Sequence, residues 1–397
     1  MVNFTQQDFI GDTQMCKYLI ELSKCAITKE VPSPANDVKL EKLIKFAQFH
    51  QIDNLIYEPL MAANPDNEQT ELLKRLQNSV YANAMLDANQ NYYLEKIAEG
   101  FEQNGVRFLV LKGGVLKKIY PETYMRKSSD LDVFVYDNLE KAMSVMDSLG
   151  FKKSDEDYGV HYNYALGSVE VELHYSMMRD KYPWSQECNA ILERTHTVDG
   201  WSYQQEMSYE DYYFYMIAHM AKHMKNGGAG IRFILDIWVY LSVYENIIDW
   251  NILNETLKRA GLYDFNVQAM KLRDVWYKGE TLGEELTAQL EEFVFANGWI
   301  GTVNSHQRAA MSAKDAGSVR KNKLDNLKQV VFPSLSIMKS RYSVLAKHPY
   351  LMPIFWVVRW VDTVLNKREM IKLHRNVMSV DVKEAVSTSE FFDNLGL

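Results

Sequence analysis

Two aspartates at the start of an apolar run are the residues whose type and spacing could hold a metal ion. Asp130 and Asp132 alternate with Leu131, Val133 and Val135. Alternate side chains of a strand point to the same face, so the two carboxylates would lie side by side. Their charges repel, and a divalent cation would offset the repulsion. Because 52 acidic residues in 397 positions give roughly seven pairs of this spacing by chance, a solvent-facing pair is the alternative.

A later segment supplies a third carboxylate. In residues 169–174, Glu170, Glu172 and His174 alternate with apolar residues and therefore share one face of a strand. If this strand lies beside the strand with Asp130, three acids converge. Two metal ions held roughly 3.5 to 4 Å apart by such acids would activate an attacking hydroxyl and stabilise a leaving oxygen. The alternative is the ordinary polar face of a half-exposed strand.

A glycine turn precedes these acids. Lys112-Gly113-Gly114 follows an apolar run of strand length, 106–111, and leads into residues with helical spacing. Glycines between a strand and a helix let backbone N–H groups approach phosphate oxygens. The turn lacks the spacing of a P-loop and of a dinucleotide-binding fingerprint, so it supports neither class. Lys112 and Arg126 add positive charge nearby.

The elements that must position these groups form an α/β unit. Strand-like runs and one amphipathic helix are predicted from composition and spacing: strands at 106–111, 131–135, 161–166 and 169–175, and a helix at 138–149. The last two strands meet at Gly167-Ser168, as in a hairpin. This predicts a compact unit from about Gly105 to Met178.

Helical patterns flank this unit on both sides. Apolar residues recur at helical spacing before residue 104, with one long helix predicted over 68–104 and loop residues at 63–67. Further helices are predicted at 209–225, 231–244, 250–260 and 265–277. We therefore predict an α+β fold, a small mixed sheet between N-terminal helices and a larger C-terminal helical domain. The expected domains are 1–104, 105–178 and 179–397.

Composition excludes several classes of protein. Hydrophobic residues make up 47% and charged residues 24%, which is ordinary for a globular chain. The net charge of −8 argues against a surface that binds nucleic acid all over. Three scattered cysteines suit neither a disulfide framework nor a four-cysteine metal site. Without a signal-like N-terminus or an apolar run of roughly 20 residues, we expect a cytoplasmic protein with no transmembrane helix.

One stretch carries the opposite charge. Residues 314–375 contain 13 Lys or Arg and 4 Asp or Glu, a charge of +9, so the remainder carries −17. With Trp356 and Trp360, this stretch could meet a membrane surface, a nucleic acid or an acidic protein face. We favour a simpler interpretation, in which a solvated helical surface packs on the acidic remainder of the chain.

Together these motifs resemble the DNA polymerase β-like nucleotidyltransferase superfamily. More narrowly, three motifs are similar to a bacterial nucleotidyltransferase family left uncharacterised: Leu111-Lys112-Gly113-Gly114, Arg126-x-x-x-Asp130-x-Asp132 and Glu172-Leu173-His174. The likeness extends to His219-x-x-x-His223, to Arg232-x-x-x-Asp236 and to the segment from Phe332-Pro333 to Pro353.

The resemblance implies roles for particular residues. Asp130 and Asp132 would ligate Mg²⁺ or Mn²⁺, and Glu172 would complete the acidic triad, with Glu170 in reserve. Gly113 and Gly114 would cradle the triphosphate. The nucleotide-binding residues predicted in all are Lys112, Gly113, Gly114, Arg126, Ser129 and Arg232.

Two helical pairs have alternative interpretations. His219 and His223 share a helical face, which could suggest zinc, but structural or substrate-facing histidines are favoured because no third ligand is evident. Arg232 and Asp236 could form a helical ion pair. Alternatively, Arg232 would reach the nucleotide while Asp236 orients it, and the sequence leaves both interpretations open.

The function predicted is Mg²⁺-dependent transfer of a nucleoside monophosphate from an NTP to a hydroxyl acceptor, with release of pyrophosphate. ATP is the first choice of donor, and the acceptor is open. One rival is a non-catalytic member of the fold that binds a nucleotide or a protein. The other is a metal-dependent phosphohydrolase, which would release inorganic phosphate.

Overall fold

The computed structural model of this chain forms two compact units. It describes residues 13–34, 37–63, 71–157, 159–299, 301–335, 338–339, 342, 344–366 and 379–397. The first unit comprises the described parts of 1–224, 229–300 and 396–397. The second comprises the described parts of 225–228 and 301–395. All the predicted site residues belong to the first unit.

Within the described residues, seven strands form one mixed sheet in the first unit, in the order β3-β4-β5-β2-β1-β7-β6. The strands are β1 (Phe108–Val110), β2 (Asp130–Val135), β3 (Lys152–Asp157), β4 (His161–Leu166), β5 (Val169–His174), β6 (His196–Thr197) and β7 (Gln204–Glu206). The pairs β2·β5 and β1·β7 are parallel, and the remaining pairs are antiparallel.

Register fixes which residues meet across the middle of the sheet. Three rows of paired residues, here called rungs, cross the sheet from β2 through β5 to β4. The residues of each rung point to the same face. The first rung is Asp130–Glu170–Ala165, the second is Asp132–Glu172–Asn163, and the third is Phe134–His174–His161. The polar face of the sheet therefore presents carboxylates on the first two rungs and imidazoles on the third.

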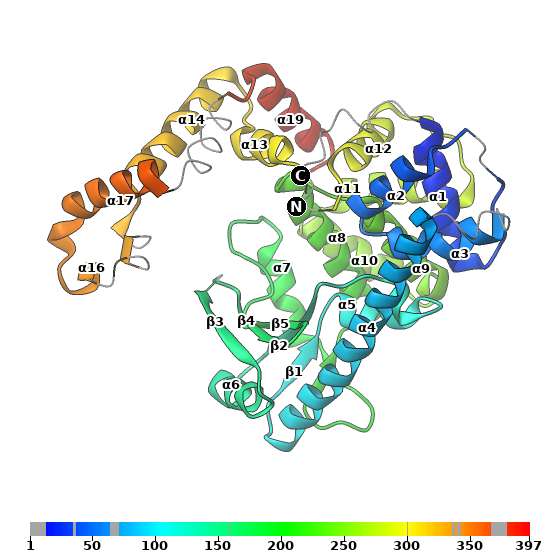
Figure 1. Ribbon diagram of the computed structural model, residues 1–397, viewed down its shortest axis with the longest axis horizontal. Helices are drawn as coiled ribbons and strands as arrows, with labels where there is room; N and C mark the ends of the chain where they lie inside the picture. Colours follow the sequence, from blue (N-terminus) through cyan, green and yellow to red (C-terminus); the bar gives the residue numbers. More distant parts are fainter. Residues whose placement is uncertain are drawn as a thin grey trace. The chain divides into compact units, whose positions relative to one another are not determined.

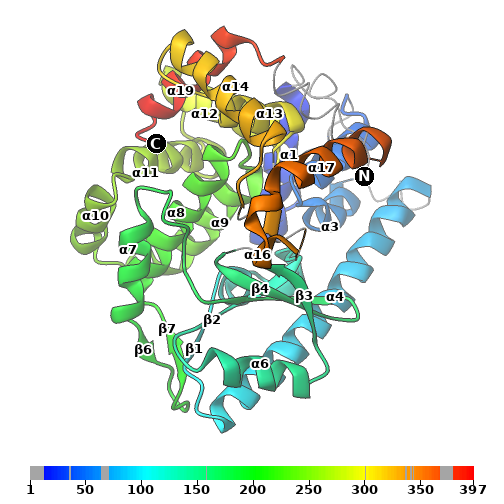
Figure 2. The same cartoon turned by 90° about the vertical axis from the view of Figure 1, so that its left-hand side faces the viewer.

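The opposite face of the sheet is apolar. There Val133, Val171 and Leu173 pack against α4 (Glu71–Gln103) and α6 (Leu139–Ser148), which cover this face in Figures 1 and 2. A Cβ at Gly100 of α4 would lie 2.6 Å from Val145 Cγ1, so only glycine lets the two helices approach this closely. The polar and apolar faces follow directly from the alternation in β2 and β5.

The remaining helices of the first unit surround this layer. They are α1 (Thr13–Thr28), α2 (Leu40–Phe49), α3 (Asp53–Ala63), α5 (Gly113–Leu116), α7 (Ser185–Ala190), α8 (Tyr209–Lys225), α9 (Ile231–Tyr244), α10 (Trp250–Arg259), α11 (Tyr263–Arg273) and α12 (Glu285–Asn297). Most residues of α9 are buried, as its nearly continuous apolar sequence requires. This helix carries both Arg232 and Asp236 into the interior.

The second unit is helical where it is described. It contains α13 (Val303–Met311), α14 (Ala316–Val331), α16 (Val344–Lys347), α17 (Met352–Asn366) and α19 (Val382–Asn394). Met311, Val319 and Ala385 form a small core there. The basic stretch 314–375 lies mainly in this unit, and its residues 367–375 lie outside the described ones. Among the described residues, no helix is long and apolar enough to cross a membrane.

The α+β class and the helices at 209–225 and 231–244 are confirmed, and the long helix is found at Glu71–Gln103. The sheet is larger than expected. β6 and β7 lie beyond Met178, in a region predicted to be helical, and β3 was not predicted. β6 and β7 are short, and β3 lies at an edge of the sheet. All three are polar, so they lack the apolar alternation that identifies a strand. Of the predicted loop 63–67, residues 64–67 lie outside the described residues.

Side chains of α3 and α4 hold the loop that carries Arg126. Asn54 donates to the carbonyls of Tyr124 and Met125 at 2.6 and 2.8 Å, and Gln90 donates to the Ser128 carbonyl at 3.1 Å. The N-terminal helices therefore determine where this loop lies against the sheet.

A buried ion pair joins α4 to the segment after the glycine turn. Lys117 Nζ lies 3.0 Å from Asp87 Oδ1, and the Lys117 side chain is 2% exposed. We predict that Asp87→Ala lowers the free energy of unfolding by about 3 to 5 kcal/mol, because it leaves a buried ammonium unpaired. Glu41→Ala, which removes the exposed Lys45–Glu41 pair, should leave stability nearly unchanged. Urea unfolding of both variants measures this, and equal effects would contradict it.

Candidate active site

The acids predicted from the sequence lie side by side on neighbouring strands. Asp130 and Asp132 start β2, and parallel pairing sets Glu170 beside Asp130 and Glu172 beside Asp132. Asp132 is 3% exposed, whereas Glu170 is exposed to solvent. The structure thus brings Asp132 and Glu172 together in a sheltered position and leaves Glu170 at the open end of the same face.

Lys112 is aimed at these acids by an unusual backbone. Its φ of +40° and ψ of −116° are rare for any residue other than glycine and cost of order 1 to 3 kcal/mol. The Tyr212 hydroxyl of α8 donates to the Lys112 carbonyl at 2.7 Å and supports this conformation. Lys112 Nζ then lies 2.5 Å from Asp132 Oδ1 and 3.8 Å from Glu172 Oε2. Strained backbone of this kind is typical of functional sites.

Two histidines complete the cluster. His174 Nε2 lies 2.8 Å from Asp132 Oδ1 and 3.1 Å from Glu172 Oε2, and His161 Nε2 lies 3.4 Å from Glu172 Oε1. The sequence showed His174 only as a neighbour on the strand face, and it did not single out His161. The signal was available, because a two-residue turn at Gly167-Ser168 puts His161 opposite His174.

A second lysine, Lys222 of α8, lies near the same cluster. Burial, and then the positive charge of Lys112, lower the pKa of Lys222 to about 8. Asp132 and Glu172 act in the opposite direction on the same pKa, so Lys222 shares the electrostatic environment of the acids. Sequence reasoning missed this residue because the turns between β5 and α8 carry no pattern that predicts their path.

The carboxylates differ in how well their charge is compensated. Burial, and then the charge of Asp132, raise the pKa of Asp130 to about 6. Burial would also raise the pKa of Asp132, but Lys112 and the hydrogen bond from His174 hold it well below its usual range. Burial opposes the charged form of Lys112 too, yet Asp132 keeps the pKa of that ammonium above its usual value. Negative charge therefore remains uncompensated at Asp130.

The donor set fits a divalent cation at this point. Asp130, Asp132 and Glu172 offer the carboxylate oxygens that Mg²⁺ and Mn²⁺ prefer. A cation would also relieve the repulsion that raises the pKa of Asp130.

The predicted glycines pack tightly between Arg126 and β1. A Cβ at Gly113 would lie 2.7 Å from Ser128 Oγ and 2.9 Å from Arg126 Nη1, and a Cβ at Gly114 would lie 2.5 Å from Val110 Cγ1. The Gly114 N–H donates to the Leu111 carbonyl at 3.1 Å, within the turn itself. A larger residue at Gly113 would collide with the Arg126 loop, and one at Gly114 would collide with Val110 of β1.

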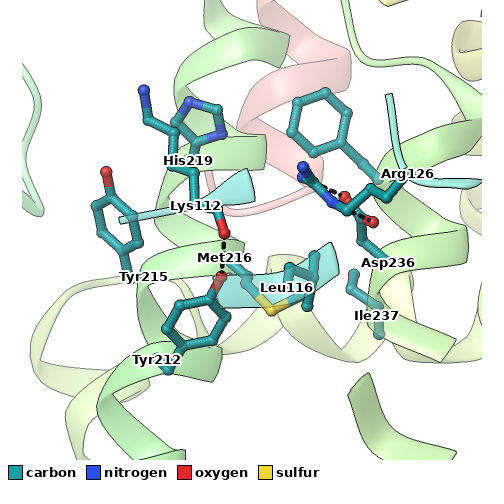
Figure 3. A pocket seen from close by; sticks show the side chains of 10 residues that line it. Lys112, Leu116, Arg126, Tyr212, Tyr215, Met216, His219, Asp236 and Ile237 are labelled. Atoms are coloured by element: carbon teal, nitrogen blue, oxygen red, sulfur yellow. Dashed lines mark hydrogen bonds and ion pairs between the residues drawn. The ribbon is translucent and has the colours of Figure 1, made fainter. Parts of the chain in front are cut away.

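Arg126 makes a two-point ion pair beside the site. Its Nε and Nη2 donate to the two oxygens of Asp236, each at 2.9 Å (Figure 3). Tyr120 donates to Asp236 Oδ1 at 2.6 Å. All three side chains are buried. Two parallel bonds of this kind fix the orientation of a guanidinium as well as its position.

Asp236 is therefore not the partner of Arg232, and the helical ion pair considered from the sequence is not formed. Arg232 instead donates to the Lys127 carbonyl at 2.8 Å and lies 3.4 Å over the Trp299 ring. Burial, and then the charge of Arg126, lower the pKa of Arg232 to about 9. Asp236 binds Arg126 directly and acts on Arg232 through its charge, which raises the pKa of that guanidinium. Ser129 is exposed beside Asp130.

The histidines of α8 pack against each other and against Phe233, and His219 also lines a hollow. The rings of His219 and His223 lie 4.6 Å apart in an edge-to-face arrangement, and both contact Phe233. Burial, and then the charge of His223, hold the pKa of His219 well below its usual range, so this imidazole is neutral. Among the described residues, no third metal ligand accompanies this pair.

Two hollows lie near the site. One, of about 30 Å³, lies between the glycine turn and α8 and α9 (Figure 3) and is lined by Lys112, Leu116, Arg126, Tyr212, Tyr215, Met216, His219, Phe233, Asp236 and Ile237. The other, of about 310 Å³, lies over β3 to β5 and is lined partly by Asp130, Glu170, Glu172, Lys152 and Lys153. The first is mostly apolar with two cations, and the second is polar.

Comparison with known proteins gives the class to which this fold and site belong. The sequence model of a family described as uncharacterised nucleotidyltransferase matches residues 36–278, more than half of the chain. The chain belongs to this family. No curated protein and no solved structure matches it.

The raised pKa of Asp130 predicts a pH dependence of stability. The folded state holds this proton up to about pH 6, whereas the usual pKa is 3.8. Stability contributed by the protonated group is therefore lost as pH rises from about 4 to 6. In EDTA, the unfolding free energy of the wild type minus that of Asp130→Asn should fall by about 1 to 3 kcal/mol over this interval. Urea unfolding at several pH values measures the difference, and a constant difference would rule out the shifted pKa.

Proposed function

We propose that this protein transfers a nucleoside monophosphate from an NTP to a hydroxyl acceptor and releases pyrophosphate, with Mg²⁺ or Mn²⁺ as cofactor. ATP is the proposed donor. The observation that carries the proposal is the sheltered group of Asp130, Asp132 and Glu172 on two parallel strands, with Lys112 against it. Nucleotidyl transfer is the general activity of the family to which the chain belongs.

The chain's own cations suit the phosphates of the donor. Lys112 Nζ touches the acid cluster, and Arg126 Nη1 lies against Gly113, so both positive groups border the glycine turn. In this proposal Gly113 and Gly114 let the triphosphate approach the backbone, while Lys112 and Arg126 stabilise its charge. Ser129 and Arg232 are proposed to contact the nucleotide from the two sides of the Arg126 loop.

The acids hold the cofactor and receive a proton. Asp130, Asp132 and Glu172 would hold the divalent cation, which neutralises phosphate charge and lowers the pKa of the acceptor hydroxyl when bound. The acceptor oxygen forms a bond to the α-phosphorus as the bond to the bridging oxygen of pyrophosphate breaks. The proton of the acceptor hydroxyl passes to a carboxylate oxygen of the cluster. The buried Arg126–Asp236 pair keeps the guanidinium in place during the reaction.

Glu172 and Glu170 allow a matched test of the proposed activity. Glu172 touches Lys112 and both histidines, whereas Glu170, one rung away on the same face, is exposed. We predict that Glu172→Gln lowers the rate of pyrophosphate release by roughly 10²-fold or more, since it removes a group acting on the reacting phosphates. Glu170→Gln should change the rate less than about threefold. The assay uses each NTP with mixed hydroxyl acceptors, and a larger effect of Glu170→Gln would transfer the role to that residue.

Binding is measured separately from turnover. Calorimetric titration with non-hydrolysable NTP analogues in Mg²⁺ and in EDTA, on the wild type and on Asp130→Ala with Asp132→Ala, tests the site itself. Metal-dependent binding that the double variant loses is the expected result. Binding that persists in the double variant would argue against the proposed site, and binding without turnover would favour a non-catalytic member of the fold.

A further inference from the structure

Nitrogen ligands stand beside the proposed oxygen-only site. His161 of β4, Glu172 and His174 of β5, and Asp132 of β2 come from three adjacent strands and share the polar face of the sheet. The imidazoles occupy the third rung, directly after the acids of the second rung. No part of the nucleotidyl-transfer proposal uses the two histidines.

The ligand atoms of this group converge. Glu172 Oε1 lies 3.4 Å from His161 Nε2, and Glu172 Oε2 lies 3.1 Å from His174 Nε2, so each carboxylate oxygen faces one imidazole. Ligand atoms of His161, Glu172 and His174 all lie within 4.8 Å of one another. Metal–ligand bonds of about 2.0 to 2.2 Å require ligand atoms roughly 3 to 3.5 Å apart, which small side-chain rotations would give.

Hydrogen bonding alone accounts poorly for this arrangement. His174 Nε2 carries at most one proton but faces two carboxylate oxygens, at 2.8 and 3.1 Å. The cluster holds three carboxylates, of Asp130, Asp132 and Glu172, against the single ammonium of Lys112 in direct contact. A second dication would satisfy the imidazole lone pairs and the remaining negative charge together.

We propose that His161, Glu172 and His174 bind a divalent first-row transition ion, such as Mn²⁺, Fe²⁺, Co²⁺ or Zn²⁺. Imidazole nitrogen favours these ions over Mg²⁺, which prefers oxygen ligands. Glu172 is then shared between this ion and the cation at Asp130 and Asp132. The inference deepens the proposed function and rests on it for the role of the ion, whereas binding itself needs no nucleotide.

Cobalt titration of the full-length chain tests the site. Metal-free protein is titrated with Co²⁺ in the absence of nucleotide, and the visible absorption of bound Co²⁺ is recorded together with the metal content. His161→Gln removes one nitrogen from a partly exposed position on β4. His196→Gln is the matched control, since this exposed histidine of β6 forms a similar ion pair with Glu206 at 3.1 Å, away from the acid cluster. Circular dichroism verifies that both variants fold.

The expected result is one equivalent of Co²⁺ that tenfold more Mg²⁺ does not displace, with affinity at least tenfold weaker in His161→Gln and unchanged in His196→Gln. Pulsed EPR of bound Mn²⁺ should detect coupling to imidazole nitrogen. Equal affinity in the wild type and in His161→Gln, or absence of nitrogen coupling, would overturn the inference. Co²⁺ binding without nucleotidyl transfer would instead count against the proposed function alone.

Discussion

The in-register parallel pairing of β2 with β5 is the constraint on which the site depends. It sets Asp130 beside Glu170 and Asp132 beside Glu172, so four carboxylates share one face of the sheet. Charges a few ångströms apart and partly removed from water repel strongly, and such an arrangement persists only with compensating positive groups. Lys112 and His174 supply that compensation at Asp132, the most deeply buried acid of the four.

Lys112 and Arg126 are held by elements outside the two acidic strands. Tyr212 of α8 fixes the strained Lys112 backbone, and Asp236 of α9 fixes Arg126 through two parallel bonds. Amide side chains from α3 and α4 anchor the loop between the glycine turn and β2. The helices that surround the sheet are thus part of the site, because they hold Lys112 and Arg126 in place.

Sequence periodicity predicts the helices and strands that have a regular apolar face. The helices at 209–225 and 231–244 and the alternation in β2 and β5 were predicted correctly, since each has a continuous apolar face. Side-chain pairs between residues far apart in the sequence could not be predicted. Arg126 meets Asp236 across 110 residues, and the sequence offered Arg232 as a nearer partner at helical spacing. Polar strands such as β3 and β7 carry no apolar alternation, so only their pairing with neighbours identifies them.

The type of ligand atom changes from one rung to the next along the strands. The first rung, Asp130–Glu170–Ala165, is the open end, with an exposed acid and no nitrogen ligand. The second rung brings Asp132 and Glu172 under cover, and the third replaces acids by His174 and His161 beside the apolar Phe134. Across the three rungs, the possible metal ligands therefore change from exposed carboxylate oxygens to sheltered imidazole nitrogens. Because the hairpin at Gly167-Ser168 sets which β4 residue joins each rung, the length of one turn determines that a histidine rather than an asparagine faces His174.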